Sequence, residues 1–263
     1  STRAATTVAI RAPAASARDA LRQMAGLLDS QVGGVYVFAG QDSATPPVPN
    51  PDGIAGSGFV TQITSAVQGL AGAGAAATNA ATLAVASSNA AGVSPFSAAL
   101  SQPAAVLAGL RSSVQVGDAS TVPTGILASA NGDVASTGSS TTGSYMRDVM
   151  RALATLGALS SSQIADPGFQ GVVADTRTSL GGAITALNAD AGVMGNRQAA
   201  LTATQSSLDD LGTALQSQLS NAQDVDMAKT LSNLAQTQTQ LQASYQLIAG
   251  LQSMSLVKFL PVS

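Results

Sequence analysis

Residues 180–222, LGGAITALNADAGVMGNRQAALTATQSSLDDLGTALQSQLSNA, decide the fold of this chain. They lie within residues 168–260, a stretch that contains no proline and repeats apolar side chains at alternating steps of three and four. This spacing is typical of the seam of a long helical coiled coil. A helix of this length predicts an elongated molecule that packs along other helices. The seam of the quoted stretch consists of Leu180, Ile184, Leu187, Ala191, Met194, Gln198, Leu201, Gln205, Leu208, Gly212, Leu215, Leu219 and Ala222.

A second, terminal helix is predicted after a break near Asn221. Asp224 can cap its first turn, and Asp226 adds negative charge at the positive end of the helix dipole. Its seam consists of Met227, Leu231, Leu234, Gln238, Leu241, Tyr245, Ile248 and Gln252, and the apolar stripe is widened by Leu247, Leu251, Leu256 and Phe259. A helix that is apolar nearly all round must be buried on several sides, and little sequence remains here to cover it. Partner chains are therefore expected to cover the terminal helix, whereas an antiparallel intramolecular hairpin is the simpler interpretation for residues 180–222.

The composition excludes most kinds of enzyme site. The chain has no histidine and no cysteine, which removes Ser-His-Asp and Cys-His groups and the zinc sites built on those ligands. The nearest carboxylate pairs are Asp209 with Asp210 and Asp224 with Asp226. Adjacent residues on a helix point about 100° apart, and Asp224 is better explained as a cap. We predict no catalysis, no cofactor and no metal site.

The charge and hydropathy of the chain argue against binding to nucleic acid and insertion into a membrane. Charged residues make up 10% of the chain, the net charge is -3, and the eleven lysines and arginines are scattered rather than clustered. No cationic face for nucleic acid is predicted. Aromatic residues make up 3%, with no tryptophan, which argues against base-stacking platforms. No run of about eighteen apolar residues occurs, so no membrane insertion is predicted.

The N-terminal part predicts a helix and a short strand. Residues 16–31 predict a helix with Ser16 and Asp19 as a capping pair. The β-branched and aromatic residues 35–38 predict a strand, closed by Ala39-Gly40 and a proline-rich stretch.

The middle of the chain is dominated by Ala, Gly, Ser and Thr. It predicts weak helices at residues 59–70, 76–91 and 97–110, and a small hairpin of residues 114–116 with 124–128. A helical pattern returns at residues 145–159. We therefore predict two domains: a mainly α, helical coiled-coil rod at 1–40 and 141–263, with the terminal helix at about 224–260, and a small mixed α/β insert at 41–140.

Two parts of the chain resemble one family. Residues 34–40, Gly-Val-Tyr-Val-Phe-Ala-Gly, followed by Pro46-Pro47, are similar to the Gly-x-Tyr-x-Phe-x-Gly element and proline pair of the third, flagellin-type hook-associated protein of bacteria. The sequences DVDMA at 224–228, LQAS at 241–244 and LVKFL at 256–260 resemble the terminal helix of the flagellin superfamily. The ending is closer to the hook-associated branch than to filament flagellins.

The resemblance implies a flagellin-like fold and a structural subunit of the bacterial flagellum that joins hook to filament. It implies type III export, an extracellular location, and partners that include identical subunits, other hook-associated proteins, flagellin and an export chaperone. In this family the first and last helices pair, and the long helix expected before Ser16 is missing from this sequence. The predicted subunit interface consists of Met227, Leu231, Leu234, Leu241, Tyr245, Ile248, Leu256 and Phe259.

Two other functions remain open on the sequence. A filament flagellin of a divergent lineage would share the same helices and the same terminal pattern. An extracellular adhesin or stalk protein would explain the Ala, Gly, Ser, Thr and Asn bias of residues 71–143. Such a stalk should carry short sequence repeats through its length, and the sequence has none.

Overall fold

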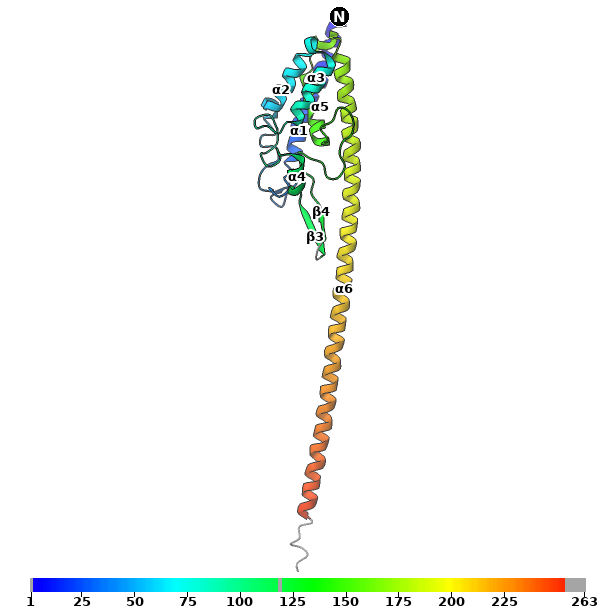
Figure 1. The fold of residues 1–263 in the computed structure, drawn as a ribbon. Coiled ribbons are helices and arrows are strands. Elements are labelled where there is room, and N and C mark those ends of the chain that lie inside the picture. Colours follow the sequence, from blue (N-terminus) through cyan, green and yellow to red (C-terminus); the bar gives the residue numbers. More distant parts are fainter. Residues whose placement is uncertain (1, 118–119, 254–263) are drawn as a thin grey trace, which may run out of the picture. The chain divides into compact units, whose positions relative to one another are not determined.

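The computed structural model describes residues 2–117 and 120–253, and it confirms the predicted mainly α fold (Figure 1). The chain divides into two compact units, Ser1–Leu201 and Thr202–Ser263. In chain order the described elements are α1 (Thr2–Leu28), β1 (Gln31–Val32), β2 (Val35–Tyr36), η1 (Ile54–Gly56), α2 (Gly58–Gln68), α3 (Leu70–Ser87), α4 (Ala104–Leu110), β3 (Ser113–Gly117), β4 (Ser120–Pro123), α5 (Tyr145–Ala158), η2 (Ser161–Ala165) and α6 (Phe169–Ser253).

Helix α1 packs against α5 through a stripe of small and apolar side chains. The buried stripe consists of Ala14, Ala17, Leu21, Ala25 and Leu28. Their spacing of three and four is that of one helix face. The predicted start of this helix near Ser16 is wrong, because α1 begins at Thr2 and Ser16 is an exposed interior position. Asp19 forms an ion pair with Arg22 at 2.9 Å and does not cap the helix.

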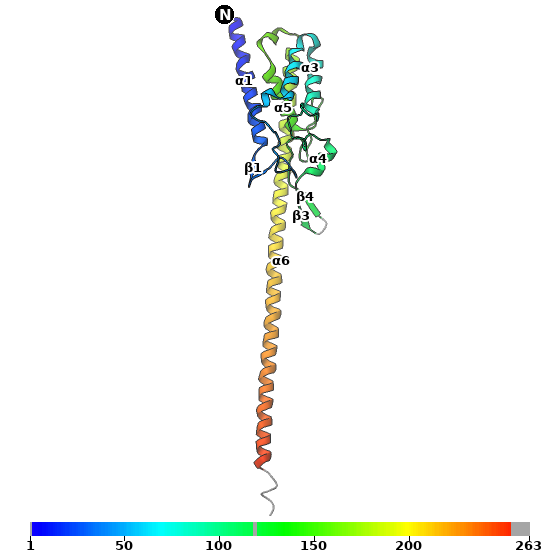
Figure 2. The ribbon, with the colours of Figure 1, turned by 90° about the vertical axis from the view of Figure 1, so that its left-hand side faces the viewer.

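Helices α2 and α3 complete the first unit around α5. Both contact α5, and Figure 2 shows α1 and α3 on its two sides. The hydrophobic core draws on all of these helices, with Leu21 from α1, Phe59 and Ile63 from α2, Met150 from α5 and Val172 from α6. The helices predicted at residues 59–70 and 76–91 are thus present as α2 and α3. The division into a rod and an insert at 41–140 stays a prediction.

Two small antiparallel hairpins lie between the helices. Strands β1 and β2 pair Val32 with Val35 around a turn in which Gly33 and Gly34 both have positive φ. Strands β3 and β4 pair Ser113 with Pro123. The hairpin predicted in this region is confirmed, but its second strand is not at residues 124–128. Thr124 has already left the ladder, because its backbone N–H donates to Ser112 O at 2.8 Å.

Helix α6 continues without interruption for 85 residues. The predicted break near Asn221 is wrong, since no proline stops the helix there and the i to i−4 pattern persists across this residue. Asp224 is therefore an interior position and not the cap of a new helix. Among the helices of the described residues, none combines the length and the apolar character needed to cross a membrane.

Candidate functional site

The second unit presents a stripe of exposed apolar side chains on α6. Leu231, Leu234 and Leu241 are each at least 50% exposed, and Tyr245 is 68% exposed. The other large exposed apolar residues of this unit are Leu208, Leu211, Leu215, Leu219, Met227, Leu247 and Ile248. Of the predicted interface residues, Leu256 and Phe259 lie outside the described residues, and the remaining six lie on this stripe.

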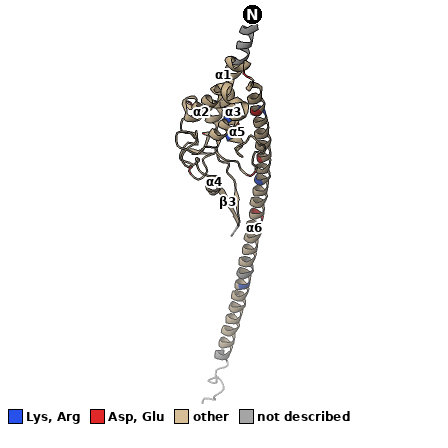
Figure 3. Cartoon of the chain, turned by 45° about the horizontal axis from the view of Figure 1, so that its top comes forward, with Lys and Arg blue, Asp and Glu red and all other residues tan. Residues whose placement is uncertain are grey.

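From Met227 to Ile248 the stripe follows one continuous face of the helix, except that Leu247 lies on a different side. From Met227 the steps to Leu231, Leu234, Gln238, Leu241, Tyr245 and Ile248 alternate between four and three residues. Few charges interrupt it, as Figure 3 shows. The charged residues of 202–253 are Asp209, Asp210, Asp224, Asp226 and Lys229. A face of this kind can pack along another helix by knobs-into-holes contacts.

In the first unit, α6 docks on the body with a different face from the predicted seam. Its buried stripe is small or polar at most positions: Phe169, Val172, Thr176, Ser179, Ala183, Ala186 and Asp190. The predicted seam residues Ile184 and Leu187 are 53% and 38% exposed. The predicted intramolecular hairpin of residues 180–222 is wrong for the described part of the chain, because no second helix covers Leu208, Leu215 or Leu219.

Asp190 is the centre of the polar contacts that hold α6 in the first unit. Its buried carboxylate accepts hydrogen bonds from the backbone N–H groups of Gly132 at 2.6 Å, Asp133 at 2.7 Å and Val134 at 3.3 Å. It also accepts the Tyr145 hydroxyl at 2.8 Å. Burial, and secondly this hydrogen bond, raises the pKa of the Tyr145 phenol. The carboxylate is thus satisfied by four donors from one loop and from the start of α5.

Two ion pairs support this attachment on either side of Asp190. Asp175 lies 3.3 Å from Arg151 and accepts a hydrogen bond from Ser140 at 2.8 Å. Arg197 pairs with Asp133 and also donates to Pro123 O at 3.2 Å. The hydrogen bond from Arg197 is the main cause that lowers the pKa of Asp133. The sequence pattern does not predict these contacts. The one signal for them is an aspartate at position 190 in the stripe of Ala183 and Ala186.

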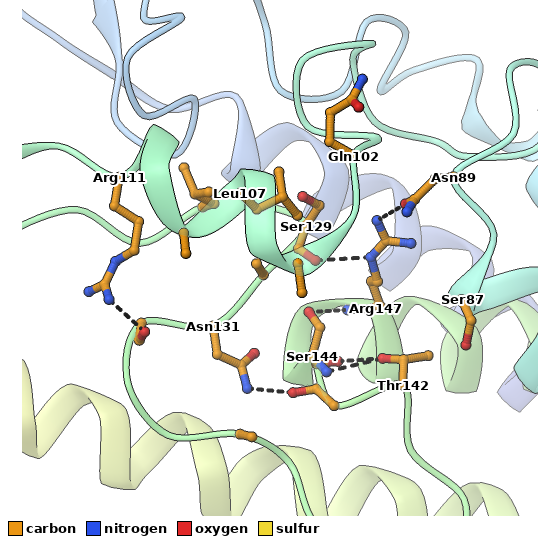
Figure 4. A pocket seen from close by; sticks show the side chains of 17 residues that line it. Ser87, Asn89, Gln102, Leu107, Arg111, Ser129, Asn131, Thr142, Ser144 and Arg147 are labelled. Carbon is orange, nitrogen blue, oxygen red and sulfur yellow. Dashed lines mark hydrogen bonds between the residues drawn. The ribbon is translucent and has the colours of Figure 1, made fainter.

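A pocket of about 490 Å³ lies where α3, α4, α5 and the loop at 127–135 meet (Figure 4). Arg147 and Arg111 line it, together with Ser129, Asn131 and Ser144. A second groove of about 540 Å³ lies between α1, α2 and α5, and its charged lining residues are Arg18, Asp19, Arg22 and Asp52. The described residues contain no group of three or more carboxylate side chains placed to hold a metal ion.

Of the two carboxylate pairs considered as candidates for catalysis, the structure describes the side chains of one. Asp209 and Asp210 are exposed on α6 in the second unit. Asp224 and Asp226 lie within α6, far from either end of the helix, and the structure does not describe their side chains.

Residues 178–260 match the family model of the bacterial flagellin C-terminal helical region. The match covers most of α6 and all of the exposed stripe. Nothing matches the chain among curated proteins or among solved structures. Flagellins are structural proteins that assemble into polymers of identical subunits.

Proposed function

We infer that this chain, whose residues 178–260 are similar to the flagellin C-terminal helical region, is a structural subunit of the bacterial flagellum that joins hook to filament. The coarser part of this statement, a subunit of the flagellum and hence an extracellular structural protein, is supported by the match itself. The finer part, the junction between hook and filament, is supported by the sequence of residues 34–40 and by the ending of the chain.

The exposed stripe on α6 carries the proposal. Burying a side chain such as Leu234 or Leu241 stabilises an assembly by about 1.5–3 kcal/mol relative to leaving it in water. The stripe repeats such side chains over Met227 to Ile248, and each of them is at least half exposed. Sister copies or neighbouring flagellar proteins that lay a helix along this face would cover it. Type III export and a dedicated export chaperone belong to the same proposal.

A filament flagellin is the second candidate, because the match to the flagellin C-terminal helical region fits both roles equally. The two candidates predict different assemblies. A filament flagellin polymerises into long filaments on its own, whereas a junction subunit stops at a short ring or requires a neighbouring protein. Long filaments grown from the full-length protein alone would identify the flagellin.

The interface is tested by replacing Leu234 and Leu241 with glutamine in the full-length protein. We expect assembly to be lost, because two seam contacts per subunit, together about 3–6 kcal/mol, disappear. The matched control is Ser232→Gln with Thr239→Gln, which lie roughly 160° around the helix from the two leucines. Sedimentation and electron microscopy measure assembly, and thermal unfolding of the first unit should be the same in all three proteins. Unchanged assembly of the leucine variant would show that the stripe is not the interface.

A further inference from the structure

The pocket at the start of α5 has an unusual charge balance for this protein. Its charged lining residues are Arg111 and Arg147, and no aspartate or glutamate lines it. The groove between α1, α2 and α5 differs, since Asp19 and Asp52 there accompany Arg18 and Arg22. The whole chain carries more acidic than basic residues, with a net charge of -3. A pocket with arginines alone is therefore not explained by composition.

Arg147 is buried without a carboxylate partner. It is 6% exposed, and no ion pair involves it among the described residues. Its guanidinium donates to Ser129 O at 2.9 Å and to Asn89 Oδ1 at 2.7 Å, and it also donates to Ala86 O at 3.0 Å and Ser88 O at 3.3 Å. All of these acceptors are neutral groups. The guanidinium also lies 5.2 Å from the centre of the Phe96 ring.

The surroundings balance this charge only in part. The carbonyl of Ala86 belongs to the last turn of α3, where the helix dipole supplies a partial negative charge. Burial lowers the pKa of Arg147, because the charged guanidinium has lost water without gaining an anion. Arginine is almost never buried in proteins without a paired anion. Of the other charged groups at the site, Arg111 pairs with Asp133 at 3.3 Å, and the Asp148 carboxylate in the first turn of α5 is bound by Thr142. Arg147 is thus the one charged lining residue of the pocket that makes no ion pair among the described residues.

Two further groups face the same pocket. The N-terminus of α5 lies at Ser144, which caps the helix and is a lining residue. Ser129 also lines the pocket, is 2% exposed, and its Oγ has no hydrogen-bond partner among the described residues. Four other buried polar atoms of the described residues also lack a partner, but Ser129 is the one of these residues that lines the pocket, where a ligand could complete its hydrogen bonding. Both features favour a ligand with negatively charged oxygen atoms.

We propose that this pocket binds a small molecule through one carboxylate or phosphate group, held by Arg147 with Ser129 as a second donor. The oxyanion supplies the negative counter-charge that the Arg147 guanidinium lacks. Charge-assisted hydrogen bonds of this kind are stronger than hydrogen bonds between neutral groups. A volume of about 490 Å³ is in the range of small-molecule sites. Bound there, the ligand joins the C-terminus of α3 to the start of α5. This site is separate from the stripe on α6 and does not depend on the proposed role in the flagellum.

The test uses the full-length protein with inorganic phosphate and acetate as probes, and chloride at equal ionic strength as the reference. We expect phosphate, acetate or both to raise the unfolding temperature of the protein saturably. The anion whose effect saturates at the lower concentration identifies whether the pocket prefers a phosphate or a carboxylate group. Ser129→Ala removes one neutral donor and should weaken binding several-fold, while Arg147→Met should weaken it by about tenfold or more. The matched control is Arg18→Gln, since Arg18 also donates to a carbonyl, Gly157 O at 2.8 Å, but lines the other groove.

Arg147→Met also removes contacts with Ala86 and Ser88, so an NMR titration of the wild-type protein provides a measurement that needs no variant. Phosphate or acetate should shift the amide signals of Asn89, Ser129 and Ser144 together. The proposal is overturned if neither probe gives a saturable effect, if the shifted signals lie elsewhere, or if Ser129→Ala and Arg18→Gln bind equally well.

Discussion

Tyr145 donates its phenolic hydroxyl to the carboxylate of Asp190 across 2.8 Å, and both side chains are completely buried. The contact joins the first residue of α5 to the N-terminal third of α6, 45 positions later in the chain. In the part of the chain that the structure describes, it is the one side-chain hydrogen bond to this carboxylate, since the other donors are the backbone N–H groups of residues 132–134. This geometry makes Asp190 the residue on which the docking of α6 in the first unit depends.

Replacing Tyr145 or Asp190 should therefore destabilise the first unit, and the two replacements should differ in size. Tyr145→Phe removes one hydrogen bond to a charged group, which costs about 1.5–3 kcal/mol. Asp190→Ala should cost more, about 3–5 kcal/mol, because it leaves several buried donors without an acceptor. Asp209→Ala is the control, since Asp209 is exposed and should change the unfolding free energy by less than about 0.5 kcal/mol. Urea unfolding measures all three, and an Asp190→Ala protein as stable as the control would contradict this role.

The sequence predicted the helical character of α6 but not which face meets the body. Large apolar residues such as Ile184 and Leu187 follow the coiled-coil spacing, so the pattern selected their face as the buried one. The structure buries Ala183, Ala186 and Asp190 instead. Small side chains let α6 approach the loop at 132–134 closely, and a loop leaves no periodic signal in the sequence. Here the apolar periodicity predicted the helix correctly, but it did not identify the face that is buried.

The pocket could not be predicted for a related reason. The acceptors of Arg147 include backbone carbonyls of Ala86 and Ser129, and any residue type could supply them. The first helix shows the opposite case, in which a local motif misled the prediction. Ser16 and Asp19 have the spacing of a capping pair, so the predicted start at Ser16 came too late. Packing against α5 stabilises this part of the helix despite its weak pattern.

Two glycines near the α6 attachment should respond in opposite ways to alanine. A Cβ added to Gly132 would lie 2.6–2.9 Å from the carboxylate atoms of Asp190, which are fixed by their hydrogen bonds. Gly132→Ala should therefore cost about 1–3 kcal/mol by overpacking. Gly192 is an exposed α6 residue with no atom within 4 Å of an added Cβ. Gly192→Ala should stabilise the helix by up to about 1 kcal/mol. Thermal unfolding compares them, and a shift of the same sign in both would contradict the assigned geometry.

Acidification should weaken the attachment of α6 through Asp133. Hydrogen bonds and charge from Arg197 and Arg111 lower the pKa of Asp133 below its ordinary value of 3.8. A carboxyl group with a lowered pKa stabilises the folded state above its unfolded-state pKa, and this contribution is lost as the pH falls through the folded value. The window lies below about pH 4. Because the side chain is 30% exposed, the effect should be no more than about 1 kcal/mol.

Asp29 provides an internal comparison of opposite sign. Burial raises the pKa of Asp29, although its carboxylate accepts a hydrogen bond from the Val48 backbone N–H at 2.8 Å. A raised pKa stabilises the folded state below the unfolded value, so this group offsets part of the loss at acid pH. Asp133→Asn should therefore make the fall in stability between about pH 5 and about pH 2 shallower. Asp29→Asn should make the same fall steeper. Urea unfolding across this range gives the slopes, and equal slopes in the two variants would show that the Arg197 pair does not contribute to the acid response.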